Sequence, residues 1–257
     1  MADTAYPRFG LFNTEERILH SQVVGQDYQI GIWFPFSYRA SEWNYPVLYV
    51  LDGEFAFGMA TGLMATLIGM EEVPEMLVVG IAYHGISSWQ EHSDLRNLDF
   101  LPGIYQEHPE DTRLPQFTRF FQQELFPLIE NEYRGAADDR GIFGFSSGGF
   151  FAMHALLTQT AMFRRIIAAS CTWSGASDFL LDRAPDPAQL FPPTDLFLAV
   201  GENDKKQLAG FERLSGALRG RQDPNLRIST AIYEGEGHSS GVLAKSFLQG
   251  VRTVYNS

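Results

Sequence analysis

The segment Arg140-Gly-Ile-Phe-Gly-Phe-Ser-Ser-Gly-Gly149 decides the fold of this chain. Its apolar residues 141–145 predict a short buried strand, and the glycines that follow predict a sharp turn into a helix. Gly144-x-Ser146-x-Gly148 is the pattern of a serine held on a strand-to-helix elbow, where the neighbours two residues away must be nearly free of side chains. A second match, Gly237-His-Ser239-Ser-Gly241, lies near the chain end. The motif alone therefore does not select one serine.

Strand-like and helix-like runs alternate on both sides of this elbow. Residues 16–24 and 28–34 are β-rich, and Gly25-Gln-Asp27 between them predicts an antiparallel hairpin. Six further strands are expected at 46–51, 76–82, 141–145, 165–169, 196–200 and 227–233. Helices are expected at 55–70, 112–133, 147–158, 206–218 and 240–254, and Pro127 should kink or split the second of them. This alternation predicts an eight-stranded, mostly parallel sheet with helices on both faces.

The chain is expected to form one domain over residues 1–257, because its length suits a single large α/β unit and no domain boundary is visible. Hydrophobic residues make up 45% of the chain, which is enough for a sizeable core. Segments 84–111 and 174–193 are irregular and rich in Gly or Pro. They are predicted to cover a site rather than to link domains.

Charge and cysteine content limit the partners and the compartment. The formal net charge is −12, which disfavours nucleic acids and anionic membranes as partners. No apolar run is long enough to span a bilayer, and the N-terminus lacks the apolar core of a secretory signal. The single cysteine, Cys171, is expected to be buried and structural. We therefore expect a cytoplasmic protein.

Chain order distinguishes the two candidate serines. Ser146 is followed by carboxylates and by a histidine, whereas the 18 residues after Ser239 contain no His, Asp or Glu. An elbow serine of an α/β-hydrolase precedes its acid and then its histidine, so Ser146 is the expected nucleophile. The adjacent Ser147 is disfavoured because Phe145, two residues before it, is too bulky for the elbow.

His238 is the expected general base, because it follows the last predicted strand in the glycine-rich loop 235–241. His84, at the end of the fourth strand, precedes the serine and is a candidate for substrate binding. His154 is expected to pack within a helix. The other three histidines are expected at the surface: His20, His92 and His108.

Several carboxylates could orient His238. Asp204 and Glu202 compete in the loop Val200-Gly-Glu-Asn-Asp-Lys205, and Asp178 and Glu236 are weaker candidates. Asp204 could instead cap the following helix. An oxyanion hole needs backbone N–H donors. One is expected from Ser147, and the other from Gly53 or Glu54 in the loop after the third strand.

Several segments together resemble the putative-esterase branch of the α/β-hydrolases, the branch of enterochelin-esterase-like and esterase-D-like proteins. The matching stretches are Tyr45-Pro-Val-Leu-Tyr-Val-Leu-Asp-Gly53, Arg96-Asn-Leu-Asp99, Glu124-Leu-Phe-Pro-Leu-Ile-Glu-Asn-Glu-Tyr-Arg134, 141–149 and Glu234-Gly-Glu-Gly-His238. The resemblance implies a single-domain α/β-hydrolase fold and a serine hydrolase that acts on esters without metal or organic cofactor. Ser146 and His238 match the nucleophile and base, and the spacing Gly201-x-x-Asp204 is similar to that of the acid in the superfamily.

The resemblance also bears on substrate binding. Arg96 and Asp99 are similar to an Arg-x-x-Asp element of the family, either as an ion pair or with Arg96 contacting a substrate carboxylate or phenolate. Trp173 could line the acyl pocket or belong to the core. Aromatic residues near the predicted covering segments suggest a site for an aromatic or bulky apolar group: Phe55, Phe57, Trp89, Phe100, Trp173 and Phe179.

These observations predict a serine carboxylic-ester hydrolase that works through an acyl-serine on a small or secondary-metabolite-type ester. Two alternatives remain at this stage. An acyltransferase would use the same residues, and a catalytically silent binding protein would keep only the fold. The expected partner is a small-molecule ester, and the oligomeric state is left open.

Overall fold

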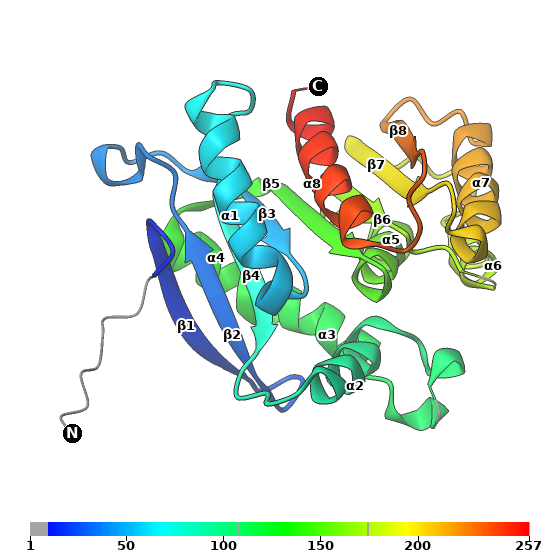
Figure 1. Cartoon of the computed structure of the whole chain (residues 1–257), viewed down its shortest axis with the longest axis horizontal. Helices are drawn as coiled ribbons and strands as arrows, with labels where there is room; N and C mark the ends of the chain where they lie inside the picture. Colours follow the sequence, from blue (N-terminus) through cyan, green and yellow to red (C-terminus); the bar gives the residue numbers. More distant parts are fainter. Residues whose placement is uncertain (1–9, 107, 174, 257) are drawn as a thin grey trace.

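One eight-stranded sheet organises the computed structural model, which describes residues 10–106, 108–173 and 175–256. The strands lie in the order β1-β2-β4-β3-β5-β6-β7-β8 (Figure 1). β2 is antiparallel to both β1 and β4, and every other neighbouring pair is parallel, as expected from the sequence. The strands are β1 (Thr14–Ser21), β2 (Gln26–Trp33), β3 (Tyr45–Val50), β4 (Leu77–Tyr83), β5 (Gly135–Phe145), β6 (Arg165–Ala169), β7 (Thr194–Gly201) and β8 (Leu226–Tyr233).

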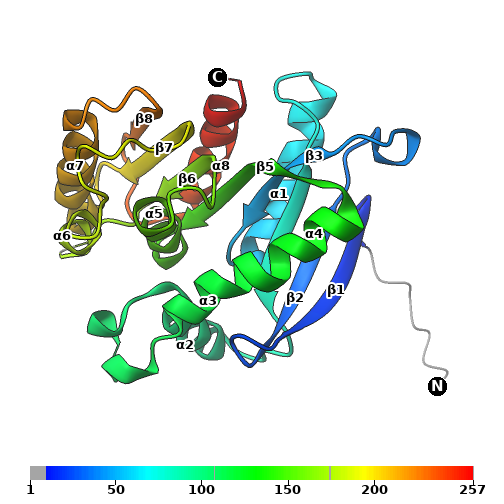
Figure 2. The same cartoon turned by 180° about the vertical axis from the view of Figure 1, so that it is seen from behind.

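Helices cover both faces of this sheet. α1 and α8 pack on one face, in front in Figure 1, and α3 to α7 lie on the other, which faces the viewer in Figure 2. The helices are α1 (Gly53–Gly69), α2 (Trp89–Phe100), α3 (Leu114–Phe120), α4 (Phe126–Tyr133), α5 (Ser147–Thr158), α6 (Ala176–Leu181), α7 (Lys205–Gly220) and α8 (Ser240–Tyr255). Short 3₁₀ turns occur at Tyr38–Ala40, Gly103–Tyr105 and Pro109–Asp111.

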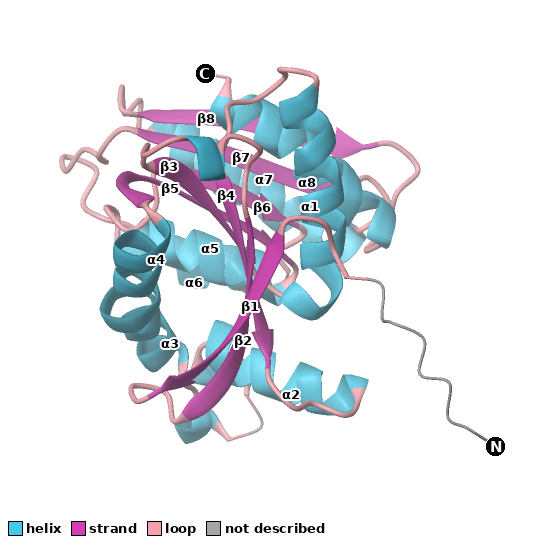
Figure 3. Ribbon diagram, turned by 90° about the vertical axis from the view of Figure 1, so that its left-hand side faces the viewer, coloured by secondary structure: helices cyan, strands magenta, loops and turns pink. Residues whose placement is uncertain are grey.

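Burial of the strands follows from these two layers. Every residue of β4, β6 and β7 is buried, because helices cover both of their faces. β4 reads as an apolar run, and β6 and β7 do so after their first residues, where Arg165 and Asp195 pair at 3.7 Å. β1 is mostly exposed at the edge of the sheet. Figure 3 shows β1 and β2 steeply inclined to β7 and β8, the twist expected of such a sheet. The carboxyl ends of the parallel strands lie along one edge, where their loops meet.

Two segments predicted to be irregular contain helices. Segment 84–111 includes the twelve-residue α2, and segment 174–193 includes α6; residues 107 and 174 lie outside the described chain. α2 escapes an apolar-periodicity search because its buried face carries charged or polar side chains, His92 and Asp99. The signal that would have found it is Ser88-x-x-Glu91, where the Ser88 side chain accepts a hydrogen bond from the Glu91 N–H.

The helix predicted over 112–133 is divided, as Pro127 indicated. α3 ends at Phe120, a π-helical turn covers Phe121–Leu125, and α4 begins at Phe126 with Pro127 in its first turn. Proline lacks an N–H and clashes with the preceding turn, and the wider π turn accommodates this without separating the helices. Phe117, Phe121 and Ile129 are fully buried against the sheet.

Candidate active site

Ser146 sits on a strained elbow between β5 and α5. Its φ and ψ angles are 57° and −123°, a region that side-chain-bearing residues rarely adopt. A Cβ on Gly144 would collide with the Gly148 carbonyl, and one on Gly149 would lie 2.9 Å from the Ala169 oxygen. The Ser146 N–H donates to that same oxygen at 2.9 Å. The glycines are therefore required by the close approach of strand, turn and helix.

Ser239, the second match to the motif, has a different local structure. Its φ and ψ angles are −132° and 162°, which is ordinary extended backbone. Its hydroxyl accepts a hydrogen bond from the Val242 N–H at 3.3 Å and donates to Glu236 at 2.6 Å. Ser239 thus caps α8, and the strain that marks an elbow is found at Ser146.

His238 and Asp204 meet at the carboxyl edge of the sheet. His238 Nδ1 lies 2.8 Å from Asp204 Oδ2; the Asp204 side chain is 7% exposed and that of His238 is 40% exposed. Asp204 occupies the N-cap position of α7, but within the described chain its carboxylate forms no capping hydrogen bond. A Cβ on Gly201 would lie 2.5 Å from the Glu236 and Gly237 oxygens, so this glycine lets the two loops approach.

The other candidate acids are engaged elsewhere. Glu202 Oε2 accepts a hydrogen bond from the Gly235 N–H at 3.0 Å. Asp178 pairs with Arg213 at 2.5 Å, and Glu236 pairs with Lys245 at 2.7 Å. Of the four carboxylates considered from the sequence, Asp204 is the one that contacts the His238 ring.

The remaining histidines divide into three groups. His20 and His108 are exposed, as expected, and His84 is exposed at the end of β4, outside the linings of the pockets described below. His154 packs against Phe150, and burial lowers its pKa to about 4. The expectation for His92 was wrong. It is 1% exposed on α2, because it faces Asp52, which precedes α1, and Glu54 in the first turn of α1 rather than solvent.

Ser146 and His238 line two adjacent pockets. The larger, about 550 Å³, is bounded by Leu101, Tyr105, Ser146, Ser147, Trp173, Asp204, Lys206, Gln207 and His238. The smaller, about 310 Å³, is mainly apolar and bounded by Leu51, Asp52, Phe55, Ala56, Trp89, His92, Arg96, Phe143, Phe145, Ser146, His238, Ser239, Ser240 and Leu243. The two residues thus lie where the pockets join.

The aromatic residues suggested by the sequence are distributed between pockets and core. Phe55 and Trp89 form one wall of the smaller pocket, with ring centroids 5.1 Å apart and exposed fractions of 52% and 68%. Trp173 lines the larger pocket and also packs on Phe150, so it combines the two roles considered for it. Phe100 is buried in the core.

Arg96 and Asp99 are both paired, but not with each other. Arg96 binds Asp52 through two hydrogen bonds, with Nε 2.7 Å from Oδ1 and Nη2 2.8 Å from Oδ2. Asp99 lies 2.8 Å from Arg113 and accepts hydrogen bonds from two tyrosine hydroxyls. The predicted Arg96–Asp99 ion pair is wrong, because each side chain is bound by a partner from another segment, Asp52 and Arg113 respectively.

Several residues around Ser146 were not predicted from the sequence. Asp52 precedes α1 and is contacted by His92, and Asn97 contacts Ser147. Tyr105 and Gln207 line the larger pocket. Gln207 is fixed there because its side-chain oxygen accepts the Thr172 N–H at 2.5 Å. Asp52 and Asn97 both lie in stretches that carried the family resemblance, and this was the available signal.

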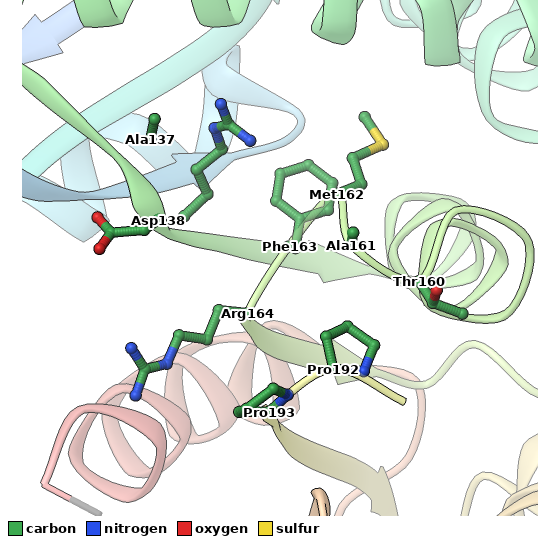
Figure 4. A pocket seen from close by; sticks show the side chains of 10 residues that line it. Ala137, Asp138, Thr160, Ala161, Met162, Phe163, Arg164, Pro192 and Pro193 are labelled. Carbon is green, nitrogen blue, oxygen red and sulfur yellow. The ribbon is translucent and has the colours of Figure 1, made fainter. Parts of the chain in front are cut away.

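Cys171 and a more distant cavity lie outside the linings of these two pockets. Cys171 is 1% exposed, as expected, and burial raises its thiol pKa to about 12. A cavity of about 280 Å³ lies at the opposite edge of the sheet, where Figure 4 shows Asp138, Phe163 and Arg164 around it. Its described lining holds no serine or histidine.

Among the described residues, no helix has the length and apolar character required to traverse a bilayer.

The strand order and the strained elbow define a fold of the α/β-hydrolase type. Residues 21–226 match the family model described as Putative esterase, and the chain belongs to this family. The ferri-bacillibactin esterase BesA of Bacillus subtilis is 28% identical over 253 residues, which cover 90% of this chain and 86% of BesA.

Solved structures agree with this assignment. The BES protein from Bacillus cereus superposes with a TM-score of 0.85 and 26% identity over 99% of both chains. The siderophore hydrolase EstB from Aspergillus nidulans has the same fold, with a TM-score of 0.77 and 22% identity over 97% of this chain and 98% of EstB. Family membership and these relatives support an ester hydrolase activity.

Proposed function

We propose that this protein is a serine carboxylic-ester hydrolase with Ser146 as nucleophile, His238 as general base and Asp204 as the acid. The observation that carries the proposal is the 2.8 Å contact between buried Asp204 and His238 Nδ1 in a pocket that also contains Ser146. With Nδ1 held by the carboxylate, Nε2 is the ring nitrogen available to the serine hydroxyl.

The reaction then proceeds through an acyl-enzyme. Ser146 Oγ attacks the ester carbonyl as His238 takes its proton, and the proton passes from His238 to the departing alcohol. Water, deprotonated by His238, cleaves the acyl-serine. The negative charge on the tetrahedral oxygen is stabilised by the N–H of Ser147 and by that of Gly53 or Glu54. These residues begin α5 and α1, where first-turn N–H groups lack helical partners.

The two pockets suit the two halves of a bulky ester. Segments 84–111 and 174–193 act as covers within a single domain: the first supplies Trp89 and Tyr105, and the second contributes Phe179, which packs on Tyr105. The names of BesA and EstB suggest a siderophore-type ester as substrate. This small-molecule ester is the partner we propose.

The decisive experiment replaces each candidate serine in turn. Ser146→Ala should abolish hydrolysis of 4-nitrophenyl acetate and labelling by a fluorophosphonate probe, with unchanged circular dichroism. Ser239→Ala, the matched control, should retain both, because its hydroxyl is engaged in capping α8 and in the bond to Glu236. Undiminished turnover by Ser146→Ala, with Ser239→Ala inactive, would contradict the assignment. Product analysis with added alcohols or amines distinguishes hydrolysis from acyl transfer.

A further inference from the structure

Helix α2 contacts three segments that surround Ser146. In the lower part of Figure 1, α2 lies beneath the end of β5 and the start of α5. Its residues His92, Arg96 and Asn97 reach, in turn, the loop before α1, the last residue of β5, and the first residue of α5. These are the segments that carry the proposed nucleophile and both proposed oxyanion donors.

Arg96 joins two of these segments. Its guanidinium donates hydrogen bonds to both carboxylate oxygens of Asp52, and Nη2 also donates to the Phe145 carbonyl at 3.3 Å. Both charged side chains are only 14% exposed. A planar guanidinium paired in this two-pronged way fixes direction as well as distance. The residue before Gly53 is thereby tied to the residue before Ser146.

His92, one turn before Arg96 on α2, faces the same Asp52 oxygen. Its Nε2 lies 3.5 Å from Asp52 Oδ1 and 3.5 Å from Glu54 Oε2, and its side chain is 2% exposed. Glu54 Oε1 accepts a hydrogen bond from the Tyr83 N–H at 2.5 Å. The two carboxylates that flank Gly53 are therefore both anchored.

The charge and the backbone conformation of Asp52 explain why these contacts matter. Burial opposes ionisation of Asp52, but Arg96 and His92 lower its pKa to about 2, so it stays charged. Its backbone is left-handed, with φ and ψ of 54° and 49°, which carries strain unless surrounding contacts maintain it. The start of α1 is set by this conformation.

Asn97 completes the arrangement on the side of the elbow. Its Oδ1 accepts a hydrogen bond from the Ser147 hydroxyl at 3.4 Å. We propose that α2 is a positioning element, in which Arg96, assisted by His92 and Asn97, fixes the separation of the two oxyanion donors across Ser146. This inference rests on the proposed function, and it assigns Arg96 to positioning rather than to substrate binding.

An oxyanion hole tolerates only small displacements of its N–H donors. Donors must lie within about 2.7–3.1 Å of the developing oxyanion, and loss of one donor costs about 10²–10³-fold in kcat. If Asp52 loses its bonds to Arg96, the first turn of α1 can rotate, and the N–H of Gly53 or Glu54 no longer points at the oxyanion. Arg96 also borders the smaller pocket, but methionine keeps most of its apolar stem, so ground-state binding should change little.

The test compares Arg96→Met and Arg96→Lys with Arg113→Met. Arg113 is the matched control because it also pairs with a buried carboxylate, but its partner is Asp99 near the end of α2 rather than one of the three segments, so its loss tests the stability of the helix alone. We expect kcat of Arg96→Met to fall about 10- to 100-fold with KM within about threefold, and Arg96→Lys to recover part of it. Arg113→Met should lower thermal stability and keep kcat. An aryl trifluoromethyl ketone, whose adduct carries the oxyanion, should lose affinity in parallel with kcat.

The outcomes separate the inference from the proposed function. If Ser146→Ala is inactive but Arg96→Met keeps wild-type kcat and inhibitor affinity, α2 has no positioning role. An equal fall of kcat in Arg113→Met would assign the effect to stability and likewise overturn the inference. If Arg96→Met fails to fold, Arg96→Lys decides by the same two measurements. Full activity of Ser146→Ala would instead remove the proposed function, and the oxyanion hole with it.

Discussion

At the scale of single residues, backbone conformation distinguishes two serines that share one motif. Ser146 has positive φ and lies between glycines that approach neighbouring backbone, whereas Ser239 is extended and caps a helix. Strain of this kind persists only where the surrounding structure holds it, and it concentrates at functional sites. The assignment of Ser146 therefore has support that is independent of chain order.

Asp204 permits a sharp test at the same scale. Asp204→Asn should lower kcat about 10²- to 10⁴-fold, because the amide cannot stabilise the charged imidazole or hold its tautomer. Glu202→Gln is the matched control from the same loop; its bond to the Gly235 N–H serves the turn, so kcat should stay near wild type. Steady-state kinetics on 4-nitrophenyl acetate measures both. A larger loss in Glu202→Gln would reverse the assignment of the acid.

At the scale of elements, α2 combines structural and proposed positioning roles. Burial opposes a charge on His92, but the Asp52 and Glu54 carboxylates, each 3.5 Å from Nε2, raise its pKa to about 9. A histidine whose pKa is higher in the folded than in the unfolded state stabilises the fold fully below its ordinary pKa of about 6.5. That stability is lost as the pH rises through about 9.

This gives a pH-dependent prediction for α2. Relative to His92→Gln, the wild-type free energy of unfolding should decline between pH 6.5 and 9, by on the order of 3 kcal/mol. Urea denaturation at pH 6.5, 7.5 and 9 measures it. The difference in unfolding free energy between wild type and His154→Gln should change little over this range. Burial lowers the pKa of His154 to about 4, so its ring is neutral in the folded protein at all three pH values. A flat difference for His92 as well would contradict the charged His92.

At the scale of the whole molecule, two helix layers pack against one sheet, and the site lies at the carboxyl ends of the strands. α8 shows how closely these layers pack. A Cβ on Gly250 would collide with Ile167 of β6 and lie 3.0 Å from Phe197 of β7. The helix that follows the His238 loop is therefore held close to the sheet.

Gly250→Val should destabilise the protein by about 1–3 kcal/mol, because the added methyl groups force α8 away from the sheet. Gly216→Ala in α7 is the control with the opposite sign. A Cβ there meets no heavy atom within 4 Å, so the loss of backbone freedom in the unfolded chain should stabilise the fold by about 0.5–1 kcal/mol. Thermal and urea unfolding measure both, and a stabilised Gly250→Val would show that α8 is not closely packed.

Much of the fold was accessible from local pattern. Buried strands such as 141–145 and 165–169 are short apolar runs, and chain order after Ser146 pointed to His238 and Asp204. Local pattern does not reveal α2, and it wrongly predicts a surface position for His92, because the buried face of this helix carries His92 and Asp99 beside Phe100 instead of a continuous apolar stripe. A pattern search for apolar faces has no signal for a helix of that kind.

The sequence by itself determined the eight strands, the helices with apolar faces, the elbow and the candidate residues, because these depend on neighbours along the chain. Only the tertiary structure decided their partners. It brought Asp204 rather than Glu202 against His238, and it paired Arg96 with Asp52 rather than Asp99. The physical reason is that charge pairing acts through space. Asp204 and His238 are 34 residues apart, and Asp52 and Arg96 are 44 apart; such pairs become neighbours only when the parallel strands align their carboxyl ends.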